Sequence, residues 1–131
     1  MIVDSSAIVA IVRDESDADH FANALAGASI AAMSAVNWME VAIIVDSAND
    51  PVASRRFDEL VRVARIDIVA VTPDHAVKAR EAYRDFGKGS GHRARLNFGD
   101  CFAYALATST GRPLLFKGDD FTHTDLTSAL R

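Results

Sequence analysis

The sequence has little cysteine: Cys101 is its single one, so no disulfide can form within the chain. It also lacks a long apolar run. The longest, around Val41 to Val45, is far too short to cross a bilayer, and no basic segment precedes the apolar start as a secretory signal would require. These absences predict a cytoplasmic protein, kept in the reduced state and without a membrane partner.

An excess of positive charge is missing as well. Lys and Arg number 14 against 18 Asp and Glu, which leaves a formal net charge of −4. Proteins that hold nucleic acid by bulk electrostatics are usually basic. The net negative charge therefore argues against nucleic-acid binding, unless the acids are gathered in a site that holds cations.

The length and composition are those of one folded domain. Half of the 131 residues are hydrophobic (50%) and about a quarter are charged (24%), as in an ordinary globular protein. A chain of this size suits a single compact core, so we expect residues 1–131 to form one domain.

Short apolar runs alternate with helical patterns along the chain. This alternation predicts an α/β fold: a short central parallel sheet with helices on both faces, in three α/β/α layers. The predicted strands are Ile2–Val3, Ile66–Val71 and Leu114–Phe116, with Ser29–Ala32 and Leu126–Leu130 as further short ones. The predicted helices are Ser5–Val12, Asp14–Leu25, Ala35–Ser47, Pro51–Arg65, Asp74–Phe86 and Phe98–Thr110.

Several acids follow the predicted strands or begin the predicted helices. Asp4 directly follows the first strand, and Asp119 and Asp120 follow the strand near the end of the chain. Asp100 lies in the first turn of a helix. Because the carboxyl ends of parallel strands meet at one edge of a sheet, we expect these acids to lie together.

Glu40 is the remaining candidate. It lies in a run from Trp38 to Val45 that is apolar on nearly every side, which predicts a mostly buried helix. A buried carboxylate is costly unless it is paired or bound to a metal. Glu40 is therefore expected to have a partner.

Each acid also has an ordinary structural explanation. Asp4 can cap the helix that follows it, Asp100 can interact with a helix dipole, and Glu40 can belong to a buried ion pair. Asp119 and Asp120 can form a surface turn. We favour the joint interpretation because one geometry accounts for all of these acids.

Converging carboxylates repel one another, and a divalent cation relieves the repulsion. Ligands that are all oxygen suit Mg²⁺, with Mn²⁺ as a substitute, better than Zn²⁺. Such an ion suits phosphodiester hydrolysis. Zinc is disfavoured further because no suitable spacing joins Cys101 to His20, His75, His92 or His123.

Basic residues concentrate just before Asp100. They predict a rim that binds the phosphates of a substrate, although a solvated helix face balanced by Glu81 and Asp85 explains them equally well. Lys117 either binds a phosphate or pairs with Asp119. The basic residues of this rim are Lys78, Arg80, Arg84, Lys88, His92, Arg93 and Arg95.

Several segments carry a resemblance to a known family. Residues 2–7 read Ile-Val-Asp-Ser-Ser-Ala, residues 96–101 read Leu-Asn-Phe-Gly-Asp-Cys, and residues 113–121 read Pro-Leu-Leu-Phe-Lys-Gly-Asp-Asp-Phe. With Glu40 on the intervening helix, these motifs resemble PIN domains, and among them the VapC toxins of bacterial toxin–antitoxin pairs. The resemblance covers essentially the whole chain.

This resemblance implies a PIN-like α/β fold and a magnesium-dependent endoribonuclease that cuts RNA through an activated water. By resemblance, Asp4 and Asp100 are the principal metal ligands, while Glu40 and Asp120 complete the shell or position the water. Many PIN domains carry the fourth acid in a Thr-x-Asp turn, and the aligned position here is Gly118. Asp120 is favoured over Asp119 as that acid, and both stay candidates.

The remaining implied roles concern supporting residues and partners. The resemblance implies a homodimer, a VapB-like antitoxin and an RNA substrate. The helix Asp14–Leu25 and the helix that starts at Ser34 are a candidate groove for an antitoxin segment. Ser6, Asn97 and Asp119 are expected to support the carboxylates, and Lys88, His92, Arg93 and Lys117 are expected to contact the substrate.

Two other classes stay open. The first is a PIN-like module that binds RNA or protein without cutting. The second is a phosphotransfer protein. A haloacid-dehalogenase-type phosphatase needs a second aspartate where Ser6 stands, and a receiver domain needs further acids before Asp4, although Lys117 suits its strand-end lysine.

Overall fold

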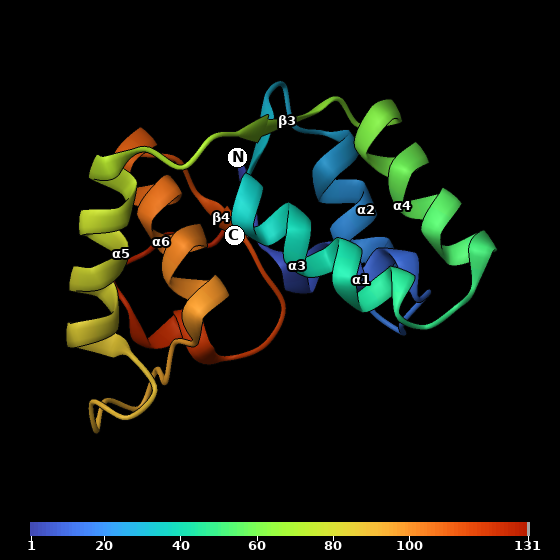
Figure 1. Cartoon of the computed structure of the whole chain (residues 1–131). Helices are drawn as coiled ribbons and strands as arrows, with labels where there is room; N and C mark the ends of the chain where they lie inside the picture. The colour runs from blue at the N-terminus through green and yellow to red at the C-terminus, as the bar shows by residue number, and fades with distance from the viewer. Residues whose placement is uncertain (131) are drawn as a thin grey trace.

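The structure is a computed structural model that describes residues 1–130 (Figure 1). Its centre is a sheet of parallel strands in the order β3-β2-β1-β4, which confirms the predicted parallel sheet. The strands are β1 (Ile2–Val3), β2 (Ala31–Ser34), β3 (Ile66–Val69) and β4 (Leu114–Leu115). The predicted strand Leu126–Leu130 is reduced to one parallel bridge between Ser128 and Leu114.

The helices follow the predicted order with one clear correction. The helix expected from Asp14 begins only at Ala18, because Asp14 has a left-handed backbone conformation (φ 53°) that interrupts the helical path. The helices are α1 (Ser5–Val12), α2 (Ala18–Ala26), α3 (Ala35–Asp46), α4 (Pro51–Val63), α5 (Pro73–Phe86) and α6 (Phe98–Thr110), and a 3₁₀ helix η1 (Asp120–His123) follows β4.

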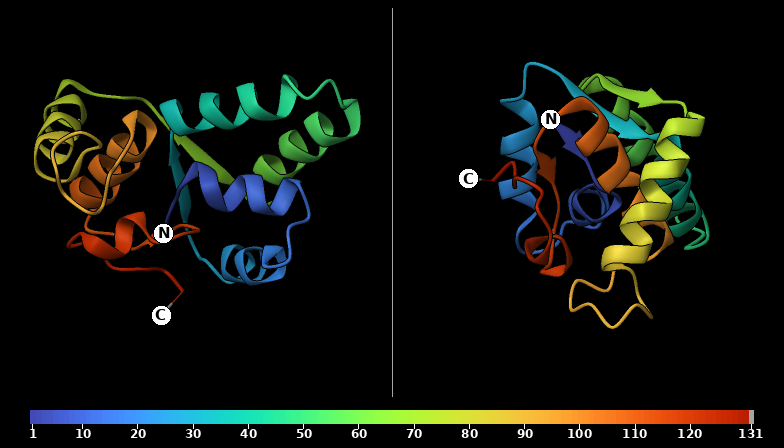
Figure 2. Two further views of the ribbon diagram at one scale, coloured as in Figure 1. Left: turned by 90° about the horizontal axis from the view of Figure 1, so that it is seen from below. Right: turned by 90° about the vertical axis from the view of Figure 1, so that its left-hand side faces the viewer.

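Alternation along the strands creates two cores and three layers. Ile2 and Leu114 belong to the core beneath α5 and α6, whereas Val3 and Leu115 belong to the core beneath α1 to α4. Successive strand residues point to opposite faces, so a two-residue strand can serve both cores. Figure 2 shows the sheet between these two groups of helices, which confirms the α/β/α arrangement.

The strand order places a switch point beside β1. From β1 the chain moves to β2 and β3 on one side of the sheet, and then returns to β4 on the other side. The carboxyl ends of β1 and β4 therefore lie next to each other, and their loops diverge. In open parallel sheets, this crevice is where ligands bind.

The prediction that α3 is mostly buried is wrong. Only Asn37, Val41 and Val45 of this helix are buried, while Met39 and Ile43 are 51% and 56% exposed. The helix lies in an outer layer, so one stripe meets the core and the opposite apolar stripe faces outward. Within residues 1–130, no helix is both long and apolar enough to cross a membrane.

Candidate active site

Asp4 lies at the carboxyl end of β1, at the switch point. It caps α1: its Oδ2 accepts hydrogen bonds from the backbone N–H of Ser6 at 3.0 Å and from Ser6 Oγ at 2.6 Å. Its Oδ1 is buried and has no hydrogen-bond partner among the described residues. The capping explanation therefore accounts for only one of the two oxygens of this carboxylate.

The surroundings of Asp4 disfavour its charge. Burial raises the pKa of the Asp4 carboxyl above its ordinary value, the two bonds from Ser6 oppose that shift, and the negative charge of Glu40 adds to it. Ser6 thus contacts the carboxylate that it was expected to support.

Asp100 lies in the first turn of α6, where Asn97 holds it in a capping box. Asn97 Oδ1 accepts from the backbone N–H of Asp100 at 2.9 Å, and Asp100 Oδ2 accepts from the backbone N–H of Asn97 at 3.0 Å. Burial raises the pKa of Asp100 to about 7 despite the Asn97 bond, with further increases from the charges of Asp4, Asp120 and Glu40. Helix capping alone does not explain so unfavourable a position for a carboxylate.

The acids predicted from four distant parts of the chain thus share one electrostatic environment. Among the described residues, Asp4, Asp120 and Glu40 are the acids whose charge raises the pKa of Asp100. Asp119 is not one of them; it is exposed and precedes η1 without a side-chain capping bond. Of the two neighbours, Asp120 is therefore the one placed to act on Asp100.

The carboxylates do not form a closed cage. Within residues 1–130, no three His, Cys, Asp or Glu side chains are packed closely enough together to make a ready metal-binding group. The exposure of Asp120 and the half-burial of Asp100 and Glu40 leave the cluster open to solvent on one side.

Three residues at the site were missed by the sequence reasoning. Ser5 Oγ donates to Glu40 Oε1 at 2.6 Å, Asn37 Nδ2 lies between them, and the carboxylate of Glu40 packs directly on Gly99. A signal existed for Asn37. It is a polar residue one turn before Glu40 in an otherwise apolar helix, and such a residue needs a buried partner.

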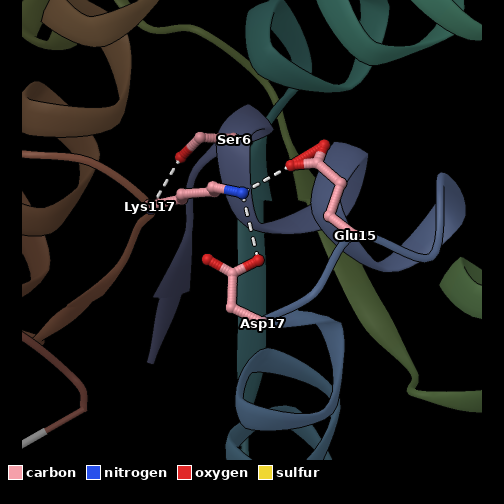
Figure 3. Close-up of polar contacts among 4 residues, drawn as sticks. All are labelled: Ser6, Glu15, Asp17 and Lys117. Atoms are coloured by element: carbon pink, nitrogen blue, oxygen red, sulfur yellow. Dashed lines mark hydrogen bonds and ion pairs between the residues drawn. The ribbon is translucent and has the colours of Figure 1, made fainter.

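Lys117 does not pair with Asp119. Its ammonium lies between Glu15 and Asp17, with Nζ–oxygen distances of 2.6 Å and 3.0 Å, as Figure 3 shows. Its backbone N–H donates to Ser6 Oγ at 2.9 Å. Lys117 therefore links the strand end before Asp120 to the loop after α1, and its charge is already neutralised.

The basic loop before α6 projects beyond α5 and α6 at the end where α6 begins (Figure 1). Lys88 and Arg93 are exposed there. His92 has a local structural role: its Nδ1 accepts from the backbone N–H of Ala94 at 3.0 Å, and its ring packs edge-on against Phe86 with centroids 5.1 Å apart.

Comparisons with known proteins place this chain in a family. Residues 1–126 match the PIN domain. The chain is 54% identical to ribonuclease VapC28 of Mycobacterium tuberculosis over 130 residues, which covers 99% of this chain and 98% of that protein. It is 52% identical to ribonuclease VapC42 of the same species over 129 residues, covering 98% of each.

Solved structures agree at the level of the fold. The crystal structure of M. tuberculosis VapC20, a toxin described as cleaving the sarcin–ricin loop, matches with a TM-score of 0.75 at 17% identity over 96% of this chain and 95% of that one. A toxin–antitoxin complex from Klebsiella pneumoniae matches with a TM-score of 0.68 at 16% identity over 92% and 88%. The chain belongs to the PIN-domain family and, within it, to the VapC ribonucleases.

Proposed function

We propose that this protein is the toxin of a type II toxin–antitoxin pair and a magnesium-dependent endoribonuclease that hydrolyses RNA phosphodiester bonds. Two features of neighbouring acids carry the proposal. Asp4 Oδ1 is buried without a hydrogen-bond partner among residues 1–130, and the pKa of the Asp100 carboxyl is raised to about 7. Both features are unfavourable in the free protein, and both are relieved by a bound cation.

The donor set suits a hard divalent ion. Asp4 and Asp100 would hold it as principal ligands, with Glu40 and Asp120 completing the shell or positioning water. All of these donors are carboxylate oxygens, which Mg²⁺ and Mn²⁺ prefer. When bound, the ion lowers the pKa of a water and neutralises charge that develops on the phosphate.

The chain's own residues provide the positioning. Ser6 ties Asp4 Oδ2 to the start of α1 and leaves Oδ1 free, and Asn97 fixes Asp100 through the capping box. The exposed Lys88 and Arg93 would attract the RNA backbone from the adjacent loop. Because its charge is already paired, Lys117 would contribute by holding its strand end in place.

The test is cleavage of a structured RNA by the purified protein. We expect cutting with Mg²⁺ or Mn²⁺, none with chelator, and at least about 100-fold slower cutting by Asp4→Asn and Asp100→Asn, which remove principal ligands. Asp67→Asn changes an exposed acid on the edge strand β3, two strands away from β1; it is the matched control and should cut like wild type.

Equal RNA binding with and without metal, and no cutting under either condition, would identify the non-catalytic module instead. Phosphoryl transfer from a small donor to Asp4 would identify the phosphotransfer class.

Two macromolecular partners belong to this proposal. The similarity to VapC ribonucleases supports a VapB-like antitoxin. α2 and α3 both pack on α1, which lies between them in Figure 2. The prediction that these two helices form a groove for an antitoxin segment is therefore wrong. A hollow of about 500 Å³ between α1 and α4 suits an antitoxin segment better.

A homodimer is supported by apolar side chains that have no cover. Met39 and Ile43 on α3 and Phe98 on α6 are more than half exposed, and these two helices pack against each other. These side chains are uncharged, so an apolar surface of a second copy complements them.

A further inference from the structure

We propose that Asn37 is a positioning residue, which holds the carboxylate of Glu40 against the start of α6. The proposal rests on the function proposed above, because it assigns meaning to the place of Glu40 among the acids. Asn37 is completely buried (0% exposed) on α3, where its neighbours along the inward stripe are Val41 and Val45. An amide in such a position is costly unless it is hydrogen-bonded.

The amide nitrogen of Asn37 joins three helices. Its Nδ2 lies 3.0 Å from the backbone oxygen of Gly99 on α6, 3.2 Å from Ser5 Oγ on α1 and 3.4 Å from Glu40 Oε1 on α3. An amide carries two hydrogens, and the two shorter contacts use both. Asn37 therefore ties the first turns of α1 and α6 to the helix that carries Glu40.

Ser5 passes this restraint on to the carboxylate. Because its Oγ accepts from Asn37, its own hydrogen is free to donate to Glu40 Oε1, at 2.6 Å. A hydrogen bond to an ionised acceptor is stronger than one between neutral groups. Oε1 is thus held by Ser5, while Oε2 is the oxygen that lies nearest to the position a Cβ of Gly99 would take.

Gly99 blocks the opposite side. A Cβ built at this position would overlap the carboxylate of Glu40, so the acid lies directly against the backbone of α6. The backbone oxygen of this same glycine accepts the hydrogen bond from Asn37. One side chain thus docks α6 on α3 and, through Ser5, fixes the acid between them.

The orientation of the amide has a cost. Asn37 Oδ1 is buried and has no hydrogen-bond partner among residues 1–130. If packing alone explained this residue, an apolar side chain would avoid that loss. The amide is retained with its nitrogen toward Ser5, Glu40 and Gly99, which is where a donor is needed.

The test is a double-mutant cycle between Asn37→Ala and Glu40→Gln in the full chain, with an RNA substrate and Mg²⁺. We expect Asn37→Ala to lower kcat by about 10- to 100-fold with KM within about twofold, the range for residues that orient metal ligands. The double variant should be no slower than Glu40→Gln alone, because both changes remove the same contribution.

Val45→Ala is the control for a purely structural effect. It removes buried volume from the same helix two turns away from Asn37, and it should leave kcat unchanged. Ser5→Ala, a milder change, should reproduce the kcat loss if Asn37→Ala does not fold. A second readout is Mn²⁺ binding followed by electron paramagnetic resonance without RNA, where Asn37→Ala should weaken binding and Val45→Ala should not.

The outcomes separate the two proposals. Losses that multiply in the double variant, or an Asn37→Ala protein that behaves like Val45→Ala, overturn the positioning role and leave the nuclease intact. If Glu40→Gln cuts like wild type, the role of Glu40 and the positioning role both fail. If even wild type never cuts RNA, the proposed function itself fails.

Discussion

At the scale of single residues, the carboxyl of Asp100 best reports the charge balance of the site. Burial and the charges of Asp4, Asp120 and Glu40 together raise its pKa to about 7. In the unfolded chain, an aspartate ionises near pH 4. Between these two values, the folded protein binds a proton that the unfolded chain has released, so the contribution of Asp100 to stability falls as pH rises.

This linkage predicts the behaviour of Asp100→Asn without metal. The variant should be more stable than wild type at pH 8, by an amount on the order of a few kcal/mol. The difference should shrink as pH falls from about 7 to about 4. Urea unfolding in chelator at a series of pH values measures it, and added Mn²⁺ should stabilise wild type but not the variant. A difference that does not change with pH would contradict the assignment.

Asp4 and Asp100 could be predicted because each follows a recognisable local signal, a strand end and a helix start. Ser5 and Asn37 could not be predicted in the same way. Their importance comes from contacts between residues 32 and 62 positions apart in the chain. The partners of Lys117 were misjudged for the same reason, because Glu15 and Asp17 are about a hundred residues away.

At the scale of elements, the contact between α3 and α6 depends on Gly99. A glycine in the first turn of a helix normally costs stability relative to alanine. Here a Cβ would overlap the carboxylate of Glu40. Either α6 or Glu40 must therefore move when any side chain is added.

We predict that Gly99→Ala destabilises the protein by about 1–3 kcal/mol, the cost of overpacking, against the direction expected from helix propensity. It should also slow RNA cleavage by displacing Glu40. Urea unfolding and cleavage rates measure these effects. The opposite change at a neighbouring buried position, Ala103→Gly, is the control: it should destabilise through helix propensity and the lost buried methyl group, and leave cleavage nearly unchanged. Stabilisation by Gly99→Ala would contradict the contact.

The ends of the elements were predicted where a capping residue marks them. Asn97, Ser34 and Asp50 all accept from a backbone N–H of the helix that follows. The start of α2 was missed because Asp14 has a left-handed conformation that a pattern of apolar residues does not reveal. The last predicted strand was reduced to a bridge because only Ser128 meets the edge of β4.

At the scale of the whole molecule, the two proposed protein partners are assigned to different apolar surfaces of residues 1–130. One is the exposed stripe of α3, with Met39 and Ile43. The other is the hollow between α1 and α4, where Val63 is 63% exposed. Arg55, Arg56 and Glu59 line this hollow, and Glu59 already pairs with Arg62. The charge of the two arginines therefore favours an acidic, amphipathic antitoxin segment over a second copy of the same chain.

These assignments predict a crossed pattern of effects. Ile43→Glu should convert a dimer to a monomer that still binds the antitoxin, because a buried unpaired charge disrupts only the interface that contains it. Val63→Glu should remove antitoxin binding and leave the dimer intact. Light scattering after size exclusion and a pull-down with the antitoxin measure both properties, so each variant is the control for the other. If Ile43→Glu removed antitoxin binding and Val63→Glu disrupted the dimer, the two surfaces would have to be assigned the other way round.

The sequence by itself determined the order of strands and helices, the parallel sheet and the acids that follow its strands, because these depend on local periodicity and on short capping motifs. Only the tertiary structure decided how those acids are supported: Asn37 between three helices, Gly99 against Glu40, and Lys117 between Glu15 and Asp17. Such contacts depend on distances between remote segments, and no local pattern records these distances.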